Sequence, residues 1–167
     1  YGWLNETWWN EEGISLLQMA PGSPDVLIIA GDAHIHKTSD AGQTWTQTYT
    51  EKIGDNWKGN GIELMVGMDV GFHPTDSLVT YIGYDDMGLW ITDDGNVSFA
   101  RNDQTRISEF DAVTSIAVDT STGDIYVGRN GGIENEKDSY NTGQVWKSVD
   151  QGQTWTVISE NLPAGKP

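Results

Sequence analysis

The fold of this chain is decided by one octet, Thr38-Ser39-Asp40-Ala41-Gly42-Gln43-Thr44-Trp45, which returns later as Ser148-Val149-Asp150-Gln151-Gly152-Gln153-Thr154-Trp155. A looser copy lies between them, Thr92-Asp93-Asp94-Gly95-Asn96-Val97-Ser98-Phe99, in which Asn, Ser and Phe replace Gly, Thr and Trp. The aspartates of the three octets are 54 and 56 residues apart. This spacing suits one four-stranded sheet with long loops for each octet.

The residue types of the octet predict a tight structural turn. A short Asp side chain accepts hydrogen bonds from turn backbone, Gly or Asn tolerates a positive φ, and the final aromatic packs between sheets. The residues expected to be structural are Asp40, Gly42, Trp45, Asp94, Asn96, Phe99, Asp150, Gly152 and Trp155. Asn96-Val97-Ser98 also fits the N-glycosylation pattern, as does Asn5-Glu6-Thr7, and the sequence leaves open whether Asn5 or Asn96 carries a glycan.

The octet resembles the Asp-box, or bacterial neuraminidase, repeat of sialidases, of tandem-propeller xyloglucanases and of sorting-receptor ectodomains. The resemblance covers nearly the whole chain, from about residue 13 to about residue 160. It implies an all-β fold, a β-propeller segment of about three four-stranded blades within a larger propeller of about six to eight blades.

Each octet has apolar, β-branched segments before and after it in the same order, and these are the strands that a blade needs. The expected strands are 15–20, 25–30, 34–38 and 44–49, then 68–73, 78–84, 88–92 and 98–101, then 113–118, 124–128, 144–148 and 154–159. The implied domain organisation is a connector 1–13, blade one 14–50, a connector 51–67, blade two 68–104, blade three 105–160, and a connector 161–167 to a missing blade.

Three blades cannot close a propeller, because the first and last sheets stay uncovered. We therefore expect the remaining blades to come from the same protein or from a second copy. The chain opens at Tyr1 without an initiator Met or a signal peptide, so we expect it to be mature or excised.

The amino-acid composition excludes some classes of binding partner. The chain has 25 acidic and 9 basic residues and a formal net charge of −16, which disfavours nucleic acid, because that partner needs Lys and Arg for its phosphates. There is no apolar run of the ~20 residues that a membrane span needs, and Cys is absent, which removes disulfides and thiolate chemistry. The Asp-box resemblance, rather than the composition, implies an extracellular protein without a cofactor, whose partner is a polysaccharide or oligosaccharide.

Antiparallel strand order sends the octet turns to one end of each sheet and the loops between second and third strands to the other end. Aligning the repeats places Asp32 and Asp86 at equivalent positions, eight residues before Asp40 and Asp94. In blade three a long acidic insertion, 131–142, interrupts this register. We expect the binding groups at this loop-bearing end.

The stretch 81–90 is similar to the strand-loop-strand that carries a catalytic acid or base in the xyloglucanases. Asp86-Met87-Gly88 matches the Asp-x-Gly of that pattern, but Leu89 stands where the family has a second Gly. A glycosidase needs a second carboxylate, which in that family comes from the other propeller, and nothing in this chain identifies it. Asp86 is thus a candidate catalytic residue or a substrate contact, with Asp32 and Asp85 as candidate substrate-binding residues.

Tryptophans in the connectors are the other carbohydrate signal. Trp8, Trp9 and Trp57 are expected at the loop-bearing end, where flat rings stack on sugars, although they could instead pad the joint with a neighbouring blade. Trp90 and Trp146 each lie four residues before an octet Asp and are expected between blades, and His36 takes the same place in blade one.

Two other site types have weaker support. A sialidase would need three converging arginines, and Arg101, Arg106 and Arg129 do not obviously converge. Asp32, His34 and His36 share a short segment, but three polar residues on one short strand are more often solvated or hydrogen-bonded than metal-binding, so no metal site is predicted.

The leading hypothesis is an extracellular carbohydrate-active propeller segment that forms part of a glycan-binding or glycan-hydrolysing cleft. Whether the protein is an enzyme, possibly a xyloglucanase-like glycoside hydrolase, is left open. The alternative is a non-enzymatic propeller that serves adhesion, sorting or extracellular assembly through protein contacts, since one fold hosts both classes.

Overall fold

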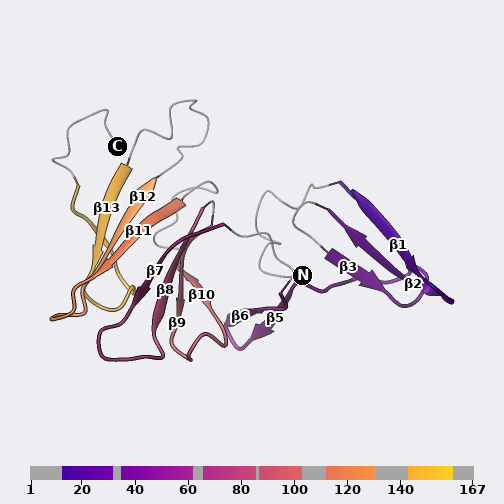
Figure 1. The fold of residues 1–167 in the computed structure, drawn as a ribbon, viewed down its shortest axis with the longest axis horizontal. Helices are drawn as coiled ribbons and strands as arrows, with labels where there is room; N and C mark the ends of the chain where they lie inside the picture. Colours follow the sequence, from indigo (N-terminus) through magenta and orange to yellow (C-terminus); the bar gives the residue numbers. More distant parts are fainter. Residues whose placement is uncertain are drawn as a thin grey trace. The chain divides into compact units, whose positions relative to one another are not determined.

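The structure, a computed structural model, describes residues 13–31, 35–61, 66–85, 87–102, 112–130 and 143–159. All regular elements in these ranges are β-strands (Figure 1). Within the same ranges we find no helix that is long and apolar enough to cross a membrane. The chain divides into two compact units, Tyr1–Leu64 and Met65–Pro167.

Three antiparallel sheets have four strands each, with neighbouring strands consecutive in the chain. The first unit contains β1 (Leu16–Ala20), β2 (Ser23–Ala30), β3 (Ile35–Thr38) and β4 (Thr46–Gln47). The second unit contains β7 (Gly67–Phe72), β8 (Thr80–Tyr84), β9 (Gly88–Thr92) and β10 (Ala100–Asn102), followed by β11 (Ala112–Val118), β12 (Ile125–Asn130), β13 (Gly143–Ser148) and β14 (Thr156–Val157). The chain is therefore an all-β segment of a β-propeller, which confirms the predicted fold class.

The fourth strands are shorter than the sequence predicts. Segments 44–49 and 154–159 were expected to be extended, yet β4 and β14 hold two residues each. Their late start follows from the octets, because the backbone N–H of Thr44 donates to Asp40 Oδ1 and that of Thr154 to Asp150 Oδ1. These donors are used inside the turn, so strand pairing begins only after the octet ends.

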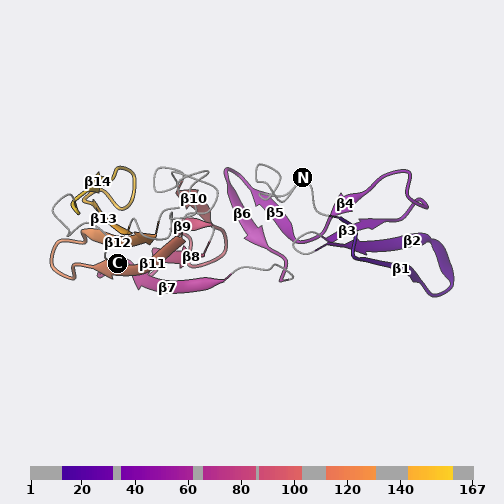
Figure 2. The ribbon, with the colours of Figure 1, turned by 90° about the horizontal axis from the view of Figure 1, so that it is seen from above.

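A hairpin that the sequence did not predict lies in the expected connector 51–67. It is formed by β5 (Thr50–Ile53) and β6 (Asn56–Gly59), which make a two-stranded sheet of their own (Figure 2). The Gln47 side chain ties its start to β4, since Oε1 accepts hydrogen bonds from the N–H groups of Tyr49 and Thr50, each over 3.0 Å.

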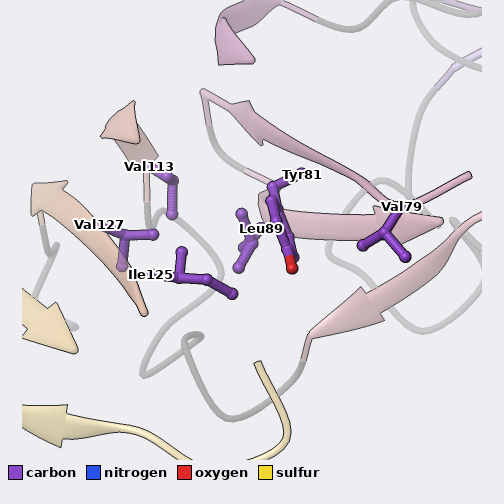
Figure 3. Close-up of a cluster of buried hydrophobic side chains, with 6 residues drawn as sticks. All are labelled: Val79, Tyr81, Leu89, Val113, Ile125 and Val127. Carbon is purple, nitrogen blue, oxygen red and sulfur yellow. The ribbon is translucent and has the colours of Figure 1, made fainter. Parts of the chain in front are cut away.

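The core of the second unit lies between its two sheets (Figure 3). Tyr81 and Leu89 face it from the β7–β10 sheet, and Val113, Ile125 and Val127 face it from the β11–β14 sheet, all of them fully buried. Burying such side chains is worth about 1.5–3 kcal/mol each. The two sheets are thus packed face to face as neighbouring blades.

Glycines set how closely the two sheets approach. A Cβ on Gly71 would lie 2.6 Å from Ile116 Cγ2, and one on Gly83 would lie 2.5 Å from the carbonyl oxygen of Val113. No side chain fits at such distances, so β11 packs directly against the backbone of β7 and β8.

Candidate functional site

The three octet turns share one backbone geometry. In each turn the fourth and fifth residues both have a positive φ, which is uncommon for residues other than Gly and Asn. The pairs are Ala41 and Gly42, Gly95 and Asn96, and Gln151 and Gly152, with φ between 58° and 90°. The sequence predicted the second position of each pair but not the first.

The octet aspartates direct both carboxylate oxygens into their own turns. Asp40 Oδ1 accepts from Thr38 Oγ1 over 2.6 Å and from the Thr44 N–H over 2.9 Å, and Oδ2 accepts from Thr44 Oγ1 over 2.5 Å. Asp150 repeats this pattern with Ser148 and Thr154. The looser octet does the same, since Asp94 bonds Thr92 Oγ1, the Ser98 N–H and Ser98 Oγ.

These hydrogen bonds stabilise the ionised form of each octet carboxyl. The bond from Thr38 comes first in lowering the pKa of Asp40 from 3.8 to about 2, and the bond from Thr154 comes first in lowering that of Asp150 from 3.8 to about 2. Ser98 holds the pKa of Asp94 lower still. The octet end of each sheet is therefore occupied by structural carboxylates.

The octet turn of blade three also holds blade two. The Asn102 side chain on β10 donates from Nδ2 to the Gly152 carbonyl, which also accepts a hydrogen bond from the Trp155 indole over 3.0 Å. A Cβ on Gly152 would lie 2.5 Å from Ile91 Cδ1. Gly152 is thus required both by its positive φ and by the contact between sheets.

The aromatic residues at the ends of the three octets differ in their surroundings. Trp155 packs against the core between the two sheets of the second unit. Trp45 is 38% exposed and lies over its own turn, with Cζ2 3.7 Å from where a Gly42 Cβ would be. Phe99 is half-buried.

At the opposite end of the β7–β10 sheet, the loop between β8 and β9 carries the predicted acidic residues. Asp85 is exposed, and its backbone N–H donates to the carbonyl of Val66 over 2.9 Å. Met87 is buried, and its carbonyl accepts a hydrogen bond from the Trp90 indole over 3.2 Å. Asp86 itself lies outside the described residues.

Leu89, which replaces a Gly of the xyloglucanase-like pattern, has a clear structural role. Its side chain is fully buried in the core between the two sheets, opposite Val113 and Ile125 (Figure 3). The departure from the pattern thus serves packing.

Trp57 lies on β6 and is half-buried. It pairs with Lys52 of β5, whose Nζ lies 5.5 Å from the ring centroid. This cation–π contact covers one face of the indole. The register of the β5–β6 hairpin pairs Lys52 with Trp57, so the sequence could have predicted this contact only if the hairpin had been recognised.

Arg129, considered from the sequence only as one of three arginines, makes a polar cluster at the loop-bearing end. Arg129, which is buried at the end of β12, donates to Gln144 Oε1 over 3.2 Å and lies 5.5 Å from the Trp146 ring. Gln144 Oε1 also accepts from the Trp146 indole over 3.0 Å. Arg129 and Gln144 are directly paired in the register of β12 and β13.

The structure describes only some of the remaining predicted site residues. Asp32, His34, Trp8 and Trp9, together with the insertion 131–142, lie outside the described residues. His36 is half-buried, with its ring edge-on to Tyr49 at a centroid distance of 6.3 Å. Among the side chains that the structure describes, no three of His, Asp or Glu gather closely enough to hold a metal ion.

Comparison with solved structures finds similarity to propeller enzymes. An ancestral GH74 enzyme shows 11% identity and a TM-score of 0.46, over 93% of this chain and 21% of that chain. The GH74 enzyme of Niastella koreensis shows 19% identity and a TM-score of 0.47, over 87% and 21%. The GH74 xyloglucanase from Xanthomonas campestris shows 21% identity and a TM-score of 0.39, over 89% and 22%.

The chain spans about a fifth of the length of these solved structures. No protein-family model and no curated protein matches it.

Proposed function

We propose that this chain is part of an extracellular, carbohydrate-active β-propeller in which the octets are Asp-box turns. The end opposite these turns would form one wall of a glycan cleft. The remaining walls would come from further blades of the same protein or of a second copy.

The observation that carries this proposal is the contrast between the two ends of the β7–β10 sheet. At the octet end, both carboxylate oxygens of Asp94 are bonded within the turn. At the loop-bearing end, Asp85 is exposed, and its carboxylate has no hydrogen-bond partner among the residues that the structure describes. A free carboxylate beside a fixed loop is suited to binding sugar hydroxyls.

Asp86 follows Asp85 directly and is our candidate for a catalytic acid or base, or for a substrate contact. Glycoside hydrolysis needs two carboxylates that flank the scissile bond, so the second must come from outside the described residues. We propose Asp32, the equivalent residue of blade one, as a substrate contact at the same end of its own sheet.

Trp57 is the candidate stacking platform in the first unit. Lys52 lies over one face of the indole, and we propose that the other face stacks on a sugar ring. Trp8 and Trp9 are proposed as further contacts of the same kind.

The test is titration of the chain with a panel of oligosaccharides that includes xyloglucan fragments, followed by tryptophan fluorescence. Trp57→Ala should weaken binding by about 1–2 kcal/mol, as expected for the loss of one buried ring. Trp45→Ala is the matched control, because Trp45 is an exposed indole at the octet end. Equal loss of binding in both variants, or no quenching by any sugar in the panel, would favour a propeller that binds protein partners.

Chemistry is tested separately with Asp86→Asn. If Asp86 is an acid or base catalyst, this variant should bind nearly as tightly as the parent but turn over about 100-fold more slowly. If the parent protein binds the oligosaccharide but does not hydrolyse it, the site is lectin-like.

A further inference from the structure

The loop between β8 and β9 is short and closed. Tyr84 and Gly88 are paired across the two strands, which leaves only residues 85–87 in the loop. Gly88 has a φ of 70°, a left-handed conformation that Gly adopts without strain. Such a hairpin holds its backbone direction but does not by itself fix the peptide groups at its tip.

Two hydrogen bonds hold the peptide groups that flank this tip, one on each side of residue 86. On one side the Asp85 N–H donates to the Val66 carbonyl just before β7. On the other side the Met87 carbonyl accepts from the Trp90 indole over 3.2 Å. Trp90 is only 3% exposed, so this bond is shielded from water. A buried hydrogen bond is costly to leave unmade.

Trp146 provides an internal comparison, since Trp90 and Trp146 each lie four residues before their octet aspartate. The Trp146 indole donates instead to the side chain of Gln144 on its own strand, over 3.0 Å. The two indoles occupy equivalent positions, but only that of Trp90 bonds the backbone of a loop that carries candidate site residues.

We propose that Trp90 is a positioning residue, whose indole N–H fixes the Met87 carbonyl and thereby the orientation of the 85–87 loop. Its consequence for activity rests on the function proposed above, because Asp85 and Asp86 belong to that site. The structural part of the proposal stands without it.

The structural part is tested by hydrogen exchange of peptides that span 84–90. Trp90→Phe keeps a ring in the core but removes the donor, and should raise local exchange about tenfold, the factor that one hydrogen bond provides. Trp146→Phe is the matched control and should leave exchange in 84–90 unchanged. Unchanged exchange in Trp90→Phe overturns the proposal.

A measurement on the unmodified chain covers the case in which Trp90→Phe does not fold. The indole N–H of Trp90, followed by NMR, should exchange with solvent much more slowly than the exposed indole of Trp45. Equally fast exchange of the two overturns the proposal.

The functional part uses hydrolysis or binding of the oligosaccharide that quenches fluorescence most strongly. If the site is catalytic, Trp90→Phe should lower kcat about tenfold and change KM little, while Trp146→Phe should change neither. If the site binds sugar without hydrolysing it, Trp90→Phe should weaken the affinity by a similar factor. Full activity in Trp90→Phe, with a loosened loop, would overturn the functional part. Absence of any sugar response in the parent contradicts the proposed function, and hydrogen exchange still decides the role of Trp90.

Discussion

Asp69 on β7 joins the two sheets of the second unit by accepting, at Oδ2, a hydrogen bond of 2.7 Å from the backbone N–H of Ile116 on β11. Its other oxygen accepts from the N–H of Val70 over 2.8 Å. A register shift in each strand, between Gly67 and Asp69 and between Val113 and Ser115, lies beside this contact. One carboxylate thus satisfies backbone donors of two neighbouring sheets.

Asp69→Ala should lower the free energy of unfolding by about 1–3 kcal/mol, because the N–H of Ile116 would lose its acceptor in a partly buried interface. Asp69→Asn retains an amide oxygen that can accept and should cost less. Chemical denaturation of the two variants measures the difference. If Asp69→Ala were as stable as the parent, the hydrogen bond between sheets would contribute nothing.

Asp94→Ala should lower the melting temperature, because it removes the acceptor for Thr92 Oγ1 and for both donors of Ser98. Asp93→Ala is the control, since Asp93 is the exposed neighbour in the same turn. Thermal denaturation compares them, and sugar binding should survive in both below the transition. Loss of binding without loss of stability would place the octet turns in the functional site.

Acid should destabilise the chain through the octet aspartates. The pKa of Asp40 and of Asp150 is lowered from 3.8 to about 2 in the folded state, so their stabilisation is complete above pH 3.8 and is lost as the pH falls towards 2. Melting temperatures between pH 5 and pH 2 should show this decline. Asp40→Asn, which cannot be protonated, should show a shallower decline, and an equal slope would assign the effect to other groups.

Gly83→Ala should cost about 1–3 kcal/mol or more, because the added Cβ would meet the Val113 carbonyl oxygen at 2.5 Å and the backbone of β11 would have to move. Gly143→Ala is the matched control within a strand, since a Cβ there has nothing within 4 Å. Urea denaturation checks both. A tolerated alanine at 83 would mean that the two sheets can separate without cost.

Tyr81→Phe should leave stability unchanged or raise it by up to about 1 kcal/mol, because the buried Tyr81 hydroxyl has no hydrogen-bond partner among the described residues. Burial, and then the charge of Asp76, raise the pKa of Tyr81. The parent should therefore lose stability as the pH rises towards ionisation of this phenol, and Tyr81→Phe should lose less. A clear destabilisation at neutral pH would reveal a bound water on the hydroxyl.

The sequence predicted most of the fold because the octet is a local signal. Hydrogen bonds from Thr44 to Asp40 and from Thr154 to Asp150 stay within four residues, so the motif can be read without tertiary information. Once the octets were placed, strands such as 113–118 and 88–92 followed from periodicity, and β11 and β9 lie within a residue of those bounds.

The candidate site could be predicted only in part, because its details depend on contacts distant from the motif. The β5–β6 hairpin has few apolar residues and depends on the Gln47 side chain, which no periodicity indicates. The contact of Trp57 with Lys52 requires the hairpin register. The packing of Leu89 against Val113 comes from a neighbouring sheet, so a pattern within one strand could only mark Leu89 as a departure.

The Gly152 carbonyl receives hydrogen bonds from its own blade, through Trp155, and from the preceding blade, through Asn102. A single peptide group therefore belongs at once to a turn and to the interface between sheets. Opening that turn would release β10 as well, so neither sheet can melt while the other keeps all its bonds. The second unit should unfold as one cooperative block, with the same midpoint whether the transition is followed in β7–β10 or in β11–β14.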